Sequence, residues 1–203
     1  ATSVKTDRSV KEIGARAFYK CNELTSIVVH EGVEVVGECA FLNCEKLTRV
    51  ELPSSIKEIR DMAFFGCDEL TFIVVPEGVE VLCDGVFRCC KKLKKVSLPS
   101  TLKKIESNAF SKCESLQMVN VPEGTEEIGS RAFFECGALE ELKLPPSTLK
   151  RIGERAFDKC TSLKRVEVPL ISAVFEHSHL QNTNSLTSVT FLSYPPTLET
   201  EPM

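Results

Sequence analysis

The sequence has no tryptophan, only two tyrosines and three histidines, and no long apolar run. A membrane-spanning helix needs about 20 consecutive apolar residues, so we expect no transmembrane segment. Positive charge is not in excess, because 25 Lys and Arg stand against 29 Asp and Glu, a formal net charge of -4. Nucleic-acid-binding domains usually carry a basic stripe, so this balance gives no reason to expect nucleic acid as a partner.

Catalytic and cofactor-binding motifs are also missing from the sequence. The three histidines are His30, His177 and His179, and none stands in a recognised catalytic pattern. The chain has no phosphate-binding loop and no dinucleotide-binding fingerprint. We therefore expect a protein that is not an enzyme and that needs no cofactor.

A regular repeat is what the sequence does contain. A phenylalanine recurs every 23 residues, with one last step of 24, and each is followed by a cysteine three positions later and a leucine three positions after that. The seven phenylalanines are Phe18, Phe41, Phe64, Phe87, Phe110, Phe133 and Phe157. A period of this length predicts a solenoid with one continuous core, a class of protein that usually binds rather than catalyses.

The third repeat, residues 56–78, shows what one unit is expected to form. Ala63, Phe64 and Cys67 have helical spacing, which predicts a short helix. Ile73 and Val75 alternate as in a half-buried strand, which Pro76 ends. We therefore predict an α/β repeat solenoid, a right-handed superhelix with a parallel concave β-sheet and short convex helices.

The repeat also divides the chain. Residues 1–9 are expected to be a polar lead-in, residues 10–169 seven repeats of 23–24 residues, residues 170–192 a degenerate eighth repeat that caps the solenoid, and residues 193–203 a Pro-rich tail. The lead-in contains no dedicated cap, so we expect a preceding segment or a neighbouring protein to cover the first coil.

The consensus resembles a known family. Segments such as Val10-Lys-Glu-Ile-Gly-Ala-Arg-Ala-Phe18 and Thr125-Glu-Glu-Ile-Gly-Ser-Arg-Ala-Phe133 closely resemble the Treponema pallidum type of leucine-rich repeat, the BspA-like family. The resemblance covers residues 10–169. It implies a bacterial or protist protein whose relatives are often surface adhesins or binders of host proteins, and it implies no catalytic residues.

The chain has ten cysteines, and seven belong to the repeat. A cysteine at one fixed place in every unit is interpreted as a small buried residue with a weak donor, although neighbouring coils leave a disulfide geometrically open. A 23-residue spacing does not suit zinc, so no metal site is predicted. Cys39, Cys83 and Cys89 lie off the repeat. Free thiols favour a reducing compartment and the resemblance favours a cell surface, so the localisation stays open.

Side chains that the repeat does not dictate carry the functional hypothesis. At outward strand positions Phe72, Val74 and Met118 are apolar, which suggests a contact surface, although scattered exposed apolar residues are also normal. The expected partner-binding residues are Phe72, Val74, Lys95, Met118, Arg49 and Lys94. The basic run Lys91–Lys95 could meet an acidic protein, a glycan or a lipid headgroup, or be a solvated corner.

These observations lead to two functional hypotheses. The first is a non-catalytic protein-interaction module or scaffold subunit that binds a protein partner through the concave face. The alternative is an extracellular adhesin that binds host matrix proteins or glycans. A signal peptide or anchor in the full-length gene would favour the adhesin, and a chain that stays reduced inside the cell would favour the scaffold.

Overall fold

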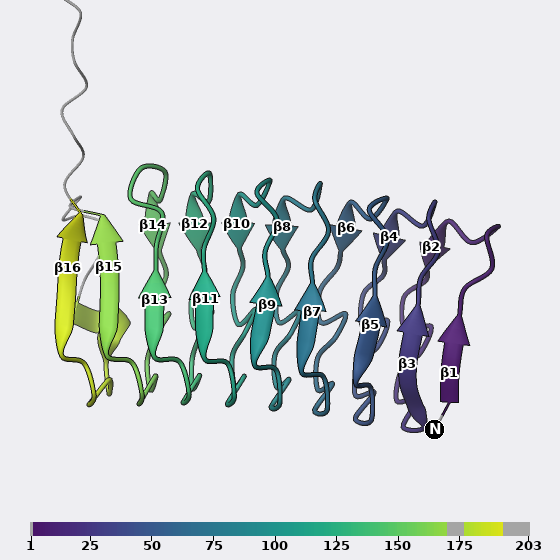
Figure 1. Ribbon diagram of the computed structural model, residues 1–203, viewed down its shortest axis with the longest axis horizontal. Coiled ribbons are helices and arrows are strands. Elements are labelled where there is room, and N and C mark those ends of the chain that lie inside the picture. The colour runs from purple at the N-terminus through teal and green to yellow at the C-terminus, as the bar shows by residue number, and fades with distance from the viewer. Residues whose placement is uncertain (1, 170–176, 193–203) are drawn as a thin grey trace, which may run out of the picture.

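The chain winds into a parallel β-solenoid in which each coil from β2 to β15 has one strand on each of two faces (Figure 1). The computed structural model describes residues 2–169 and 177–192. The tail 193–203 and residues 170–176 of the expected capping repeat lie outside the described residues. The front strands are β1 (Thr2–Lys5), β3 (Leu24–Val28), β5 (Arg49–Glu51), β7 (Phe72–Val74), β9 (Lys95–Ser97), β11 (Met118–Asn120), β13 (Glu141–Lys143), β15 (Arg165–Pro169) and β16 (Ser188–Leu192).

The back strands are shorter, with two residues each. They are β2 (Glu12–Ile13), β4 (Val35–Val36), β6 (Glu58–Ile59), β8 (Val81–Leu82), β10 (Lys104–Ile105), β12 (Glu127–Ile128) and β14 (Arg151–Ile152). A coil is a back strand, a run of turns and a front strand, and coils 1 to 7 are numbered by the seven phenylalanines. Neighbouring strands are parallel and offset by one repeat, so that Leu142 lies beside Val119 and Val166. The predicted parallel stacking in register is confirmed.

The core is a column of stacked phenylalanine rings. Consecutive rings from Phe18 to Phe157 have centroids 5.0–5.7 Å apart and planes within 18° of parallel. Six of the seven rings, Phe41 to Phe157, are fully buried. Each ring therefore packs against the coils before and after it, which explains why no coil could bury its apolar residues alone.

A second column runs beside the rings and consists of the repeat cysteines. From Cys44 onward each thiol donates to the backbone carbonyl of the phenylalanine one coil earlier, over 3.0–3.3 Å between sulfur and oxygen. The six donors are Cys44, Cys67, Cys90, Cys113, Cys136 and Cys160, and all are buried. All ten cysteines of the chain are free thiols. The interpretation of the repeat cysteine as a small buried residue with a weak donor is confirmed.

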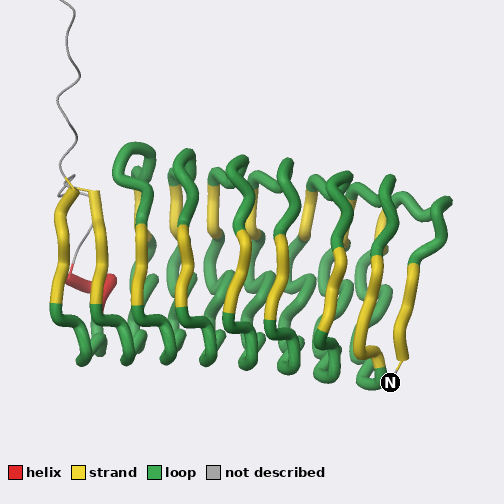
Figure 2. The backbone as a smooth tube through the Cα atoms, viewed as in Figure 1, coloured by secondary structure: helices red, strands yellow, loops and turns green. Residues whose placement is uncertain are grey.

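The predicted convex helices are wrong, and so is the α/β class. Within the described residues the one helical segment is a 3-10 helix, η1 (His177–Leu180), and turns fill the place of the expected helices (Figure 2). In the first coil Ala17 and Tyr19 donate N–H groups to carbonyls three residues back, whereas the amides of Arg16, Phe18 and Lys20 donate to the next coil. Because every second amide bonds between coils, no i to i-4 ladder can form.

Left-handed backbone accompanies this pattern. Each run of turns has two residues with positive φ four positions apart, for example Arg155 at 54° and Lys159 at 61°. A residue other than glycine pays roughly 1–2 kcal/mol for this conformation, and the bonds between coils offset the cost. The helical spacing of Ala63, Phe64 and Cys67 therefore reflects three inward positions of a turn.

Substitutions at Arg155 distinguish turn from helix by the sign of their effect. In the left-handed turn we expect Arg155→Gly to leave the free energy of unfolding unchanged or to raise it by up to about 1 kcal/mol, because glycine has no Cβ to strain. Arg155→Val should lower it by about 1–2 kcal/mol. Urea unfolding measures both. A glycine variant about 1 kcal/mol less stable than the parent is the result expected of a helix, and would contradict the turn.

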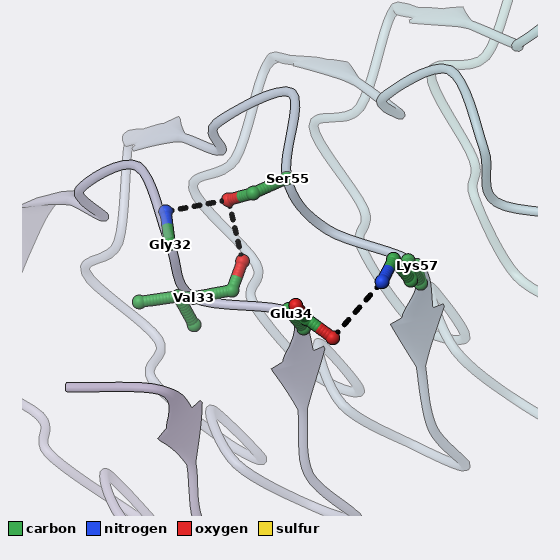
Figure 3. Close-up of polar contacts among 5 residues, drawn as sticks. All are labelled: Gly32, Val33, Glu34, Ser55 and Lys57. Carbon is green, nitrogen blue, oxygen red and sulfur yellow. Dashed lines mark hydrogen bonds and ion pairs between the residues drawn. The ribbon is translucent and has the colours of Figure 1, made fainter.

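The loops that follow the front strands link the coils in pairs. Gly32 donates its N–H to Ser55 Oγ over 2.9 Å, and that hydroxyl donates to the carbonyl of Val33 over 2.7 Å (Figure 3). Lys57 and Glu34 add an ion pair of 3.0 Å between the same loops. The Gly to hydroxyl bond recurs from Gly78 to Thr101 and from Gly124 to Thr148. We call this link the loop clamp; it joins coils 1 and 2, 3 and 4, and 5 and 6.

The front ladder is complete at the three clamped joints and open at two joints that lack a clamp, whereas β13 and β15 pair through three residues without one. β3 with β5, β7 with β9, and β11 with β13 each pair through three residues. Between coils 2 and 3, β5 and β7 do not pair, and the front strands form two sheets, β1-β3-β5 and β7 to β16. Between coils 4 and 5 the ladder has one pair, Lys95 beside Met118. The loops at both joints come in the reverse order, hydroxyl before glycine, so the clamp cannot form there.

The back strands are also interrupted, between β6 and β8. A glycine stands after the back strand in four coils, and a Cβ added at Gly37 or Gly129 would lie 2.7 or 2.5 Å from backbone nitrogen of the previous coil. Cys83 occupies this position in coil 4. Its Cβ therefore stands at the joint between β6 and β8, where the back strands do not pair. Arg60 and Glu106, at the same position in coils 3 and 5, keep their amide bonds to the previous coil.

Candidate protein-binding face

The outward side chains of the front strands form a surface that we call the front face. It corresponds to the surface predicted from the sequence as the concave face. Its first row follows the ladder register: Phe72 lies beside Lys95, Lys95 beside Met118, and Met118 beside Glu141. Val74 lies beside Ser97 in the second row. Arg49 belongs to β5, across the unpaired joint from Phe72. The structure therefore brings five of the six predicted residues onto adjacent strands of one face.

Exposed apolar side chains concentrate on this face. Phe72 is 45% exposed, Val74 50% and Met118 43%. The stability of the fold does not require apolar side chains at these outward positions. Among the described residues one other large apolar side chain is comparably exposed, Tyr19 in the turns of coil 1, at 44%. Three of these four side chains thus lie within three strands, β7 to β11.

The charges of the front face are partly paired, and among the described residues Lys95, Lys143 and Glu167 make no ion pair. Arg49 pairs with Glu51 over 2.5 Å, and Arg165 pairs with Glu141 over 2.6 Å. Lys95 makes no ion pair with any described residue, because its neighbours in the row are Phe72 and Met118. Lys94, which precedes β9, is exposed and likewise has no ion pair among the residues that the structure describes.

The basic run Lys91–Lys95 carries less uncompensated positive charge than its sequence suggests. Lys91 binds Asp68 over 2.7 Å and Lys92 binds Glu69 over 2.7 Å, each one coil earlier. The hydrogen bond to Asp68 raises the pKa of Lys91. Since both carboxylates come from the preceding repeat, the sequence could have shown this pairing. Two lysines, Lys94 and Lys95, remain uncompensated in this run.

The two open joints of the ladder each hold a hollow in the front face. The joint of coils 2 and 3 holds a hollow of about 700 Å³, lined by Arg49, Glu51, Phe72 and Val74 among others. The amides of Leu52 and Thr71 border it, and neither makes the bond to the neighbouring coil that Val75 and Lys94 make one repeat later. The hollow therefore combines apolar side chains with free backbone donors.

A smaller hollow of about 210 Å³ lies at the joint of coils 4 and 5, lined by Lys95, Ser97, Met118 and Asn120 among others. A third, of about 110 Å³, lies between coils 6 and 7, where β13 and β15 are fully paired, and is lined by charged residues of both strands. The hollows thus recur every two coils. Sequence reasoning missed them, although Glu-Gly and Ser-Ser or Ser-Thr alternate in successive loops, a 46-residue period that was available as a signal.

A cluster on the back of the solenoid offers potential metal ligands. One ligand atom each of Asp61, Cys83 and Glu106 lies within 4.8 Å of the others. Burial, followed by the charges of Asp61 and Glu106, raises the pKa of Cys83 to about 11, so the thiol is protonated at neutral pH. Glu106 is also paired with Lys104 over 3.2 Å. Because no further feature points to a ligand, we assign the cluster no role.

These features define the class of the protein: a leucine-rich-repeat β-solenoid with an exposed face of mixed apolar and basic character. The model of the BspA-type leucine-rich repeat region, which describes six repeat copies, matches residues 1–96 and 81–200. The chain belongs to this family. The predicted resemblance is therefore confirmed. Among the described residues no helix has the length and apolar character needed to cross a membrane.

Solved structures with the same fold come from bacteria. The chain is similar to the Treponema pallidum leucine-rich repeat protein, with 28% identity and a TM-score of 0.56 over 82% of this chain and 72% of the other. It is also similar to a leucine-rich cell surface protein of Faecalibacterium prausnitzii, with 22% identity and a TM-score of 0.52 over 94% of this chain and 79% of the other. The second likeness shows the fold alone. The comparison with curated proteins finds no match.

Proposed function

We propose that the protein is a non-catalytic interaction module that binds a protein partner through the front face of coils 2 to 5. The observation that carries the proposal is the gathering of Phe72, Val74 and Met118, each 43–50% exposed, on β7 and β11, which flank β9. Contiguous exposed apolar groups beside charged ones are typical of contact surfaces, whose affinity comes from a few large side chains. Arg49, Lys94 and Lys95 supply the charged part of this contact surface.

Membership of a repeat family supports the proposal. Solenoids present extended surfaces and use them for binding. The alternative, an adhesin for host matrix proteins or glycans, uses the same face and differs in the partner. The test therefore offers both kinds of partner to the same variants.

The test is an affinity pull-down with the double variant Phe72→Ser and Met118→Ser. Tagged protein is exposed to lysate of its own cells and, separately, to host extracellular matrix, and captured proteins are quantified by mass spectrometry. We expect the double variant to lose about tenfold or more of the specific partner, because hot-spot truncations cost about 2 kcal/mol or more. The matched control is Tyr19→Ser, which removes an equally exposed aromatic residue elsewhere.

Undiminished capture by the double variant, or equal loss in Tyr19→Ser, would show that the partner binds elsewhere. A front-face-dependent partner found only in matrix would establish the adhesin. One found only in the lysate would establish a scaffold.

A further inference from the structure

The hollows of the front face occur at a spacing that selects a kind of ligand. The hollow lined by Phe72 and the hollow lined by Lys95 are separated by two coils. Parallel strands lie about 4.8 Å apart, so equivalent points two coils apart are roughly 10 Å from each other. A polypeptide in the polyproline II conformation repeats its face every three residues, about 9.3 Å. Residues i and i+3 of such a segment match the two hollows.

The side chains around each hollow indicate what should enter it. Phe72 and Val74 make the larger hollow apolar, and the free amides of Leu52 and Thr71 can donate to a backbone carbonyl of the ligand. In the smaller hollow Lys95 has no carboxylate partner and lies between Phe72 and Met118. A cation left unpaired among apolar groups is complementary to a single carboxylate.

We infer that the front face binds an extended, acidic segment of a partner protein in the polyproline II conformation, with an apolar residue and an Asp or Glu three positions apart. The apolar side chain enters the hollow of coils 2 and 3, and the carboxylate pairs with Lys95 at the hollow of coils 4 and 5. This inference rests on the proposed function, because it names the chemistry of the partner for the same face.

A sulfated glycan fits the face less well than a peptide. Dense sulfate requires clustered cations, and Lys91 and Lys92 are already neutralised by Asp68 and Glu69. Val74 and Met118 offer no hydrogen bonds to sugar hydroxyls, whereas they can pack against apolar side chains. A glycan is therefore kept as an outcome of the test.

The test is selection of a displayed library of random 12-residue peptides on the immobilised full chain, with heparin fragments as the parallel probe. We expect enrichment of Pro-containing peptides with an apolar and an acidic residue three positions apart. Fluorescence anisotropy should then show that the best peptide binds Lys95→Glu at least about tenfold more weakly than the parent, because charge reversal replaces attraction by repulsion. Lys92→Glu makes the same change of net charge in the turn before β9 and should change affinity less than about twofold.

Circular dichroism of both variants checks that they fold. The inference is overturned if no peptide is enriched, if the enriched peptides lack the acid or the three-residue spacing, if Lys95→Glu binds as tightly as the parent, or if only heparin is retained. Such a failure is distinguishable from failure of the proposed function, because the pull-down depends on Phe72 and Met118 and makes no assumption about an acid or its spacing.

Discussion

Phe110→Ala is expected to lower the free energy of unfolding by about 3–5 kcal/mol, the usual cost of removing a fully buried phenylalanine. The Phe110 ring has no exposed surface, and its centroid lies 5.5 Å from that of Phe87 and 5.2 Å from that of Phe133. Truncation leaves a cavity that both neighbouring coils line, and rungs of a regular stack cannot easily collapse into it. Urea unfolding followed by circular dichroism measures the loss.

Phe72→Ala is the matched control, since it removes the same atoms from a ring that is 45% exposed. We expect a loss of about 1 kcal/mol or less, because this ring buries only part of its surface and its removal leaves no enclosed cavity. Equal losses in the two variants would contradict a core built on the phenylalanine column.

Alkaline pH is expected to unfold the protein. Burial raises the pKa of Cys44 to about 11 and of Cys160 to about 12, and it raises the pKa of Cys67, Cys90, Cys113 and Cys136 as well. Unfolded thiols titrate near 8.5, so above that pH the unfolded state releases protons that the folded state retains. Stability is therefore fully present below about pH 8 and falls as pH rises, by up to about 1.4 kcal/mol per pH unit for each thiol.

Urea unfolding in the presence of a reductant at pH 7.0, 8.5 and 9.5 measures this slope before lysines titrate. Cys113→Ala should lose one thiol's share of the pH dependence, whatever its effect on stability at pH 7. A free energy of unfolding that stays constant up to pH 9.5 would contradict the buried, protonated thiol column.

The sequence allowed the parallel coils and their register to be predicted because the repeat is long and regular. A residue type that recurs every 23 positions must occupy one place in every coil, so the buried Phe110 and Cys113 follow from counting. The helices were predicted wrongly because Ala63, Phe64 and Cys67 satisfy both a helix and a turn with three inward positions. What decides is the partner of each amide, and every second amide bonds to the next coil. Such bonds have no signature in the spacing of one unit.

The sequence predicted which side chains share a row of the front face, but it did not predict the hollows between coils. Phe72, Lys95 and Met118 lie in one row, as alternation predicts, because the side-chain period of a strand is two. The hollows lined by Phe72 and by Lys95 lie instead at joints where the ladder is open and no clamp forms. That follows from the alternation of Gly32, Ser55, Gly78 and Thr101 in the loops, a pattern visible only over two repeats.

The most direct test of the central claim, that the front face of coils 2 to 5 holds the partner, is site-specific photo-crosslinking. A benzophenone amino acid replaces Phe72 in one variant and Tyr19 in another, two aromatic side chains of equal exposure. We expect partner crosslinks from position 72, and none above background from position 19. Crosslinks from position 19, or from neither position while the partner is still captured, would show that the front face is not the binding site.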